Sequence, residues 1–210
     1  MKCPLCHSQA APFWEASGRA YFRCNECLLV FMDPAGHLSP ESEKGQYDLH
    51  QNDPTDMRYR HHLARLVDPL LAHLTPGMSG LDFGSGPGPT LSVMLEEQGM
   101  EVSIYDPYYA PDGAVLKKPY DFVTCSEVVE HFRNPSQDWM CLVGLVSAGG
   151  WLGVMTKQVP ESRDAFARWH YRRDPTHLCF YAPATWQWLA RRHRLRIEYQ
   201  ASDVTLLRKC

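Results

Sequence analysis

The chain has 210 residues, of which 44% are hydrophobic, and its 24 acidic residues outnumber its 21 lysines and arginines. This length fits one ordinary α/β domain with a small appendage, and no segment approaches the roughly 18 to 20 uninterrupted apolar residues of a membrane-spanning helix. A net charge of −3 makes a nucleic-acid partner an unfavoured expectation, because dedicated nucleic-acid-binding proteins usually carry a basic surplus. The first ten residues lack the apolar stretch of a secretory signal, so we expect a cytoplasmic protein.

Four cysteines near the N-terminus form two pairs, Cys3 with Cys6 and Cys24 with Cys27, and each pair encloses two residues. This spacing is typical of four thiolates around one zinc ion, whereas disulfide bonds are the weaker explanation in a cytoplasmic chain. Short apolar runs between and after the pairs read as strands. Residues 1–33 are therefore predicted to form a ribbon with a structural zinc ion. No cofactor motif precedes residue 80, so removal of the ribbon is expected to leave cofactor binding largely intact.

Residues 34–52 are polar and without periodicity, which indicates a linker before a domain at 53–210. Asp53 and Pro54 then have the residue types of a helix N-cap and first helical position. Apolar residues at helical spacing follow from Leu63 to Leu74, and Pro69 is expected to kink or restart this helix.

A β-α-β unit follows at residues 80–107, with the sequence GLDFGSGPGPTLSVMLEEQGMEVSIYDP. Gly84, Gly86 and Gly88 alternate after the first strand, where the absence of Cβ atoms lets a flat ligand approach the backbone. A dinucleotide fingerprint needs its third glycine at the position of Pro89. Asp106 ends the second strand and is placed to accept hydrogen bonds from ribose hydroxyls.

These residues resemble the class I S-adenosylmethionine-dependent methyltransferases. The similar stretches are LDFGSGPG (81–88), IYDP (104–107), YDFVTCSEVVEHF (120–132) and SAGGWLGVMT (147–156). The resemblance implies an α/β, Rossmann-like sheet of seven mostly parallel strands with a reversed C-terminal hairpin, and S-adenosylmethionine as cofactor. The family's third strand looks reduced, because residues 107–119 are few and rich in proline. The cofactor-binding residues expected from the resemblance are Asp82, Gly84, Ser85, Gly86, Gly88, Asp106 and Glu127.

The stretch EVVEH contains Glu127, Glu130 and His131 directly after the fourth strand, and helical spacing predicts that these three share one face. It resembles the Glu-x-x-Glu-His turn of small-RNA 2′-O-methyltransferases, which hold a divalent metal together with a later histidine. It is also similar to a Glu-His turn of polyprenyl-quinol O-methyltransferases. His177 is the candidate later histidine.

Two chemical interpretations of these four residues stay open. In the first, they hold Mg²⁺, Mn²⁺, Fe²⁺ or Zn²⁺, which lowers the pKa of an acceptor hydroxyl. In the second, His131 or His177 is a metal-free general base, with His170 as a third choice. The expected function is O-methylation of a small metabolite or glycan. The alternatives are an RNA methyltransferase whose ribbon grips RNA, and a non-catalytic cofactor-binding docking protein.

Overall fold

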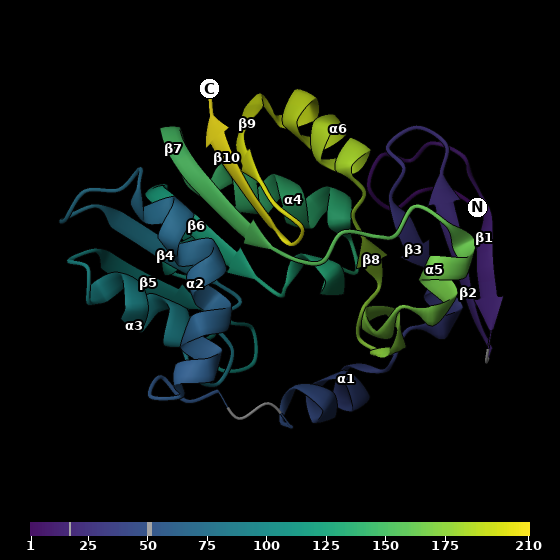
Figure 1. Cartoon of the computed structure of the whole chain (residues 1–210), viewed down its shortest axis with the longest axis horizontal. Coiled ribbons are helices and arrows are strands. Elements are labelled where there is room, and N and C mark those ends of the chain that lie inside the picture. Colours follow the sequence, from purple (N-terminus) through teal and green to yellow (C-terminus); the bar gives the residue numbers. More distant parts are fainter. Residues whose placement is uncertain (17, 50–51) are drawn as a thin grey trace.

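Most of the chain forms a central sheet with helices on both faces (Figure 1). The computed structural model describes residues 1–16, 18–49 and 52–210. In these residues the sheet has six strands in the order β5-β4-β6-β7-β10-β9. Strands β5, β4, β6 and β7 run parallel, whereas β10 is antiparallel to both β7 and β9. The strands are β4 Ser79–Phe83, β5 Glu101–Tyr105, β6 Tyr120–Ser126, β7 Val146–Met155, β9 Leu195–Gln200 and β10 Val204–Lys209.

This architecture confirms the predicted Rossmann-like fold, the mostly parallel sheet and the C-terminal hairpin. The described sheet has one strand fewer than the seven expected, because the segment between β5 and β6 forms only the short turn η2, Val115–Lys117. Pro107, Pro111 and Pro119 lie in or beside this segment, and each removes a backbone donor that a further central strand needs.

Helices cover the two faces of the sheet separately (Figure 1). On one face, α2 (Met57–Leu71) and α3 (Thr90–Glu96) pack against side chains that include Phe122. On the other face, α4 (Pro135–Gly144) and α6 (Pro183–His193) pack against side chains that include Val123, which points the opposite way along the same strand. No helix in the described parts of the chain is long and apolar enough to cross a membrane.

Helix α2 differs in two details from the prediction. It begins at Met57 with Asp56 as N-cap, because the Asp53 carboxylate accepts a hydrogen bond from the Thr55 amide and closes a separate turn. Pro69 lies in the last turn without interrupting the helix, so the expected restart is wrong, while a kink stays a prediction. A proline so close to the C-terminal end leaves the preceding hydrogen bonds of the helix in place.

The N-terminal residues form a second, antiparallel sheet that contains the predicted ribbon strands. These are β1 (Ala10–Ala16), β2 (Arg19–Cys24) and β3 (Val30–Met32). A fourth strand, β8 (Cys179–Phe180), comes from the segment after β7 and pairs with β3. The ribbon sheet is thus completed by residues almost 150 positions further along the chain.

The ribbon shares its core with that later segment. The ring of Phe166, on helix α5 (Arg163–Arg168), lies 5.2 Å from the ring of Phe13 and 5.3 Å from that of Tyr21. The ring of Phe180 in β8 lies 5.6 Å from that of Phe166. The division at residue 33 remains a prediction, but these contacts make an independent ribbon an incomplete description.

Residues 34–52, predicted as a linker, contain the turn η1 (Pro34–Gly36) and the helix α1 (Pro40–Tyr47). The sequence of α1, PESEKGQY, has no apolar stripe, and the buried residue of this helix is the charged Glu43. Ser39 caps the helix by accepting a hydrogen bond from the Ser42 amide, and Pro40 occupies the first helical position. The predicted linker includes residues 50 and 51, which lie outside the described residues.

Candidate active site

The glycine loop connects β4 to α3 and requires glycine for two separate reasons. Gly84 and Gly86 have φ angles of 83° and 65°, in the left-handed region that favours glycine. A Cβ at Gly84 would also lie 2.3 Å from the Val128 side chain, and one at Gly88 would lie 1.9 Å from the Asn52 carbonyl oxygen. Gly88 therefore makes room for another part of the chain.

Asp106 joins the glycine loop to the loop after β5. Its Oδ2 accepts a hydrogen bond of 3.0 Å from the Gly86 amide, and its Oδ1 accepts bonds from the amides of Tyr108 and Tyr109. A carboxylate has about four acceptor positions, so these three bonds leave roughly one for a ligand. Asp106 holds the loop in shape as well as facing the cavity.

A cavity of about 680 Å³ opens above the glycine loop, at the carboxyl ends of the parallel strands. This volume is within the range of small-molecule sites, and the position is where open α/β sheets bind ligands. Of the residues predicted to bind cofactor, Gly84, Ser85, Gly86, Asp106 and Glu127 line the cavity. Asp82 and Gly88 are not part of its lining; Asp82 is buried beneath the loop.

Asp82 is a buried carboxyl whose Oδ1 accepts a hydrogen bond of 2.9 Å from the Thr124 hydroxyl. Burial raises the pKa of Asp82 to about 7. Between about pH 4 and pH 7 this carboxyl is protonated in the folded chain and ionised in the unfolded chain, so the free energy of unfolding falls as the pH rises. Above pH 7 the full reduction in the free energy of unfolding is present.

We expect Asp82→Asn to remove this pH dependence and to stabilise the fold at pH 8. Three pKa units correspond to at most about 4 kcal/mol. Urea unfolding at pH 5 and at pH 8 measures the effect, with Asp68→Asn on the exposed face of α2 as the control. An equal pH dependence in wild type and Asp82→Asn would contradict the assignment.

The turn after β6 is not the helix that the EVVEH pattern predicted. Glu127 has a φ of 55°, in the left-handed region, and its amide donates to the Met155 carbonyl in β7. The turn then tightens into a short 3₁₀ segment, η3, at Val129–His131. Glu130 consequently points into the interior and is fully buried, while His131 lines the cavity. The three side chains converge through this turn and not through a helical face.

Tyr171 lies between the carboxyl groups of Glu127 and Glu130, which together form the acidic group of the site. Its hydroxyl donates to Glu127 Oε2 at 2.8 Å, contacts Glu130 Oε1 and lies 3.2 Å from the Thr156 hydroxyl. Burial, reinforced by the Glu127 charge, raises the pKa of Glu130 well above its usual range. Because the tyrosine has only one hydroxyl proton, a protonated Glu130 donates to Tyr171 while Tyr171 donates to Glu127.

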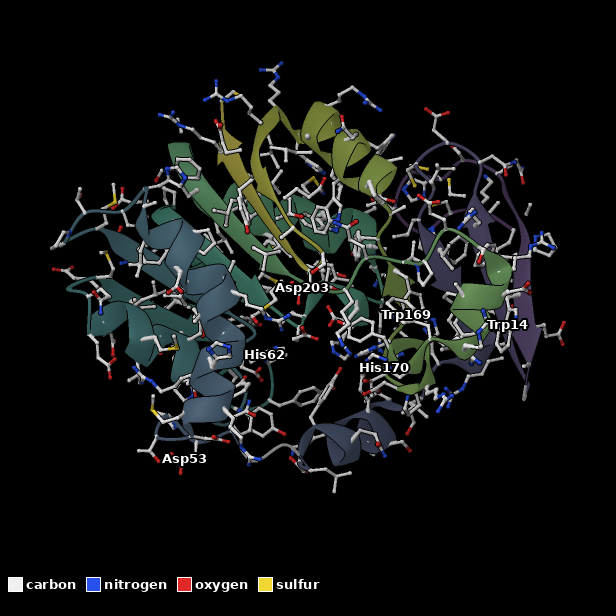
Figure 2. The ribbon with its side chains drawn as sticks, viewed as in Figure 1. Trp14, Asp53, His62, Trp169, His170 and Asp203 are labelled. Carbon is white, nitrogen blue, oxygen red and sulfur yellow. The ribbon has the colours of Figure 1, made fainter. Side chains whose placement is uncertain are left out.

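Glu127 remains ionised in this arrangement. Burial opposes its charge, but the His62 imidazole and the Tyr171 hydroxyl outweigh burial and lower the pKa of Glu127. His62, on α2, has its Nε2 3.8 Å from Glu127 Oε1. Figure 2 shows His62 on α2 and His170 on the segment after α5. His170 itself is exposed and lies 2.9 Å from Lys157 Nζ, apart from the acidic group.

His131 and His177 face each other with ring centroids 4.8 Å apart. His131 Nδ1 lies 2.9 Å from the Thr176 carbonyl oxygen and His177 Nδ1 lies 2.7 Å from the Tyr171 carbonyl oxygen. A carbonyl only accepts, so both Nδ1 atoms carry the proton. In the neutral His131 ring this leaves a lone pair on Nε2, whereas His177 Nε2 lies 3.8 Å from Asp174 Oδ2. Burial, with the His177 charge, lowers the pKa of His131 to about 4. This is the tautomer that a general base or a metal ligand needs.

Helix α1 covers the same cavity from the side. Arg133 pairs with the buried Glu43 at 2.7 Å, and the Tyr47 hydroxyl donates to the other oxygen of Glu43. The Tyr47 ring lies 5.3 Å from that of His131, edge to face. The contribution of α1 to the site could not be predicted from the sequence, because its partners Arg133 and His131 lie far along the chain.

The donor set fits a divalent ion. One ligand atom each from Glu130, His131 and His177 lies within 4.8 Å of the others, but Glu127 is outside this group. Glu130 Oε2 and Glu127 Oε1 are buried without a hydrogen-bond partner among the described residues. Carboxylate oxygen with two imidazole nitrogens suits the later first-row metals.

The four ribbon cysteines also converge. Their sulfur atoms all lie within 4.8 Å of one another, and none is in a disulfide bond. A hydrogen bond from Cys27 lowers the pKa of Cys3 to about 5. His7 and Leu28, the residues directly after each pair, have φ angles of 62° and 57°. His7 is exposed and outside the sulfur group, as expected for a bystander.

Comparison with known proteins agrees with the fold. A family model described as a methyltransferase domain matches residues 56–200. The chain therefore belongs to this methyltransferase family, and the predicted class, the S-adenosylmethionine-dependent methyltransferases, is confirmed.

One curated relative is a ubiquinone biosynthesis O-methyltransferase of Shewanella pealeana, 26% identical over 91 residues. The match covers 43% of this chain and 39% of that protein, so the chain spans about two fifths of the relative's length.

Two solved structures share the fold. One is the 1,6-didemethyltoxoflavin-N1-methyltransferase of Burkholderia thailandensis, with bound 1,6-didemethyltoxoflavin and S-adenosylhomocysteine. It has a TM-score of 0.54 and 16% identity, over 95% of this chain and 99% of that one. The other is the magnesium protoporphyrin IX methyltransferase of Synechocystis, with bound SAM. Its TM-score is 0.54 and its identity 14%, over 82% of this chain and 92% of that one.

Proposed function

We propose that this enzyme methylates an oxygen atom of a small metabolite or glycan, at the cavity between the glycine loop and the histidine pair. The observation that carries the proposal is the convergence of His131 and His177, which line that cavity, with the buried Glu130. The name of the curated relative, an O-methyltransferase, supports oxygen as the acceptor atom.

The cofactor's place is assigned to the glycine-loop side of the cavity. Phe83, Ser85 and Gly86 line it there, with Asp106 at the end of the neighbouring strand. The backbone amides of a glycine turn and a carboxylate suit the polar parts of a nucleoside. S-adenosylmethionine supplies an electrophilic methyl group on a sulfonium, and the chain's residues must align an oxygen with it.

His131 is assigned the role of accepting the acceptor's proton. Its Nε2 has a lone pair because Nδ1–H donates to the Thr176 carbonyl. As the acceptor oxygen bonds to the methyl carbon, the bond from carbon to sulfur breaks and the hydroxyl proton passes to Nε2. The Tyr171 carbonyl holds His177 in the same tautomer beside it.

A divalent ion is compatible with this arrangement. Glu130, His131 and His177 would hold it, with Glu127 nearby, and it would lower the pKa of an acceptor hydroxyl. Glu127 and Tyr171 then orient Glu130, since their oxygens share one hydrogen-bonded chain.

We also propose one structural zinc ion in the ribbon, bound by Cys3, Cys6, Cys24 and Cys27. Four thiolates leave no open coordination position, so this ion would stabilise the fold and take no part in methyl transfer.

Turnover of labelled S-adenosylmethionine with an extract of small molecules tests the proposed function. We expect the label in a neutral or acidic metabolite fraction. A methyl ester would release the label under conditions that cleave esters, whereas a methyl ether would retain it. Label only in RNA, lost on ribonuclease treatment, would favour the RNA alternative. Cofactor binding with no labelled product from any extract would favour a docking protein.

Cofactor binding can be tested separately through Asp106. We expect Asp106→Ala to weaken S-adenosylhomocysteine binding at least tenfold in calorimetry, because a charge-assisted hydrogen bond contributes roughly 1.5 to 3 kcal/mol. Asp106→Asn keeps one oxygen for the Tyr108 and Tyr109 amides, but its Nδ2 cannot accept from the Gly86 amide. An unchanged unfolding temperature therefore identifies the variants whose fold is intact. Unchanged affinity in Asp106→Ala would remove this residue from the cofactor site.

A further inference from the structure

A second pocket lies on the ribbon, apart from the residues that line the methyl-transfer cavity. It has a volume of about 350 Å³ and is formed by the β1–β2 hairpin, the second cysteine knuckle and the residues around the start of α5. Its lining includes Phe13, Arg23, Asn25, Leu28, Glu161 and Arg163. The pocket therefore combines two guanidinium groups with apolar side chains.

The two guanidinium groups face one aromatic ring. Arg23 lies 4.1 Å from the centroid of the Phe13 ring, and Arg163 lies 5.9 Å from the same centroid. Burial and the nearby charge of Arg163 lower the pKa of Arg23. The pair is therefore mutually repulsive, and an anion placed between its members would relieve that repulsion.

The pair has no acidic partner within the described residues. No carboxylate oxygen there lies within 4.0 Å of either guanidinium, although Glu161 lines the same pocket, and the arginine ion pairs involve other residues. Each guanidinium makes one long hydrogen bond, Arg23 to the Glu161 carbonyl and Arg163 to the Pro12 carbonyl, both at 3.4 Å. Arg23 Nε is buried and has no hydrogen-bond partner in the described part of the chain. Several charged donors are therefore available to a ligand.

Leu28 gives the pocket an exposed apolar edge. It follows the second cysteine pair in the left-handed conformation, where a Cβ is unfavourable and glycine is favoured. Its side chain is nevertheless 37% exposed. A leucine at this position places apolar surface beside the arginine pair.

We propose that this pocket binds the phosphate group of a small organic phosphate, with the apolar part of the ligand against Phe13 and Leu28. The planar forks of two arginines match the oxygens of a phosphate, and cations on an aromatic face are held in position for it. The pocket volume suits a ligand of mononucleotide size or smaller. The net charge of −3 for the whole chain favours a small ligand over a nucleic acid.

Calorimetry on the zinc-loaded full chain at low salt tests the proposal, with inorganic phosphate and phenyl phosphate as probes. We expect phenyl phosphate to bind at least threefold more tightly than inorganic phosphate. Arg23→Gln and Arg163→Gln should each weaken its binding at least tenfold. The control Arg196→Gln, which removes an arginine paired with Glu198 on β9, should stay within twofold of wild type.

Arg163 is exposed, so its substitution keeps the test valid if Arg23→Gln disturbs folding. S-adenosylhomocysteine affinity equal to that of wild type identifies a folded variant. The proposal is overturned if neither probe binds below about 10 mM, or if Arg196→Gln weakens binding as much as Arg163→Gln. It is also overturned if phenyl phosphate fails to bind while an RNA of about 20 nucleotides binds with dependence on both arginines, which would indicate a nucleic-acid surface.

Discussion

Replacing Cys27 by serine is expected to abolish zinc binding and to unfold the ribbon. Cys27 is fully buried, with its sulfur 3.6 Å from that of Cys3. Structural zinc contributes on the order of 10 kcal/mol to the folding of small domains, and a neutral hydroxyl replaces a thiolate ligand poorly. We expect zinc to fall from about one equivalent to less than half, and thermal unfolding to begin at a much lower temperature.

Elemental analysis and calorimetric unfolding of the purified variant measure these two effects. Cys141→Ser is the matched control, because Cys141 is exposed on α4 and outside the sulfur group. A wild-type protein that holds no zinc after expression with ample metal would contradict the proposed site. So would a Cys27→Ser variant with unchanged zinc content and unfolding temperature.

The second large effect is expected at the histidine pair. His131→Ala and His177→Ala should each lower turnover by about 10²-fold to 10⁴-fold, the usual contribution of a positioned general base. Binding of S-adenosylhomocysteine should persist, because both variants leave the glycine loop and Asp106 unchanged. His61→Ala is the matched control, since His61 is an exposed histidine on α2.

Chelation distinguishes the two chemical interpretations. If Glu130, His131 and His177 hold a metal, a chelator that leaves the ribbon zinc in place should abolish turnover, and added Mn²⁺ or Mg²⁺ should restore it. If His131 acts alone, chelation should have no effect. Near-normal turnover in both alanine variants would exclude a catalytic role for the pair.

The parts of the fold that depend on neighbouring residues could be predicted from the sequence. The glycine loop and Asp106 belong to one β-α-β unit, and their local pattern specifies both the turn and the strand ends. The C-terminal hairpin and the cysteine spacing are similarly local. Helix α1 could not be predicted from an apolar stripe, because the contacts of Glu43 and Tyr47 are with residues far along the chain.

The site residues show the same division. Glu130 and His131 could be identified as candidates because residues able to bind metal or protons lie close together in the sequence. The turn that orients them depends on the hydrogen bond from the Glu127 amide to the Met155 carbonyl in another strand. Tyr171 gave no distinguishing signal among several aromatic residues in its segment. Its central place follows from the burial of its hydroxyl between two carboxylates, which only the tertiary structure creates.

Strand β8 limits where the chain can be truncated without damage to the fold. The Leu178 amide donates to the Glu130 carbonyl, while the Leu178 carbonyl accepts from the Met32 amide in β3. The residue next to His177 is thus hydrogen-bonded to the turn on one side and to the ribbon on the other. A truncation at residue 33 would leave an unpaired strand edge and uncover Phe166 and Phe180, which favours aggregation. That cofactor binding survives removal of the ribbon stays a prediction, but grafting the ribbon onto another methyltransferase would need β8 to be carried with it.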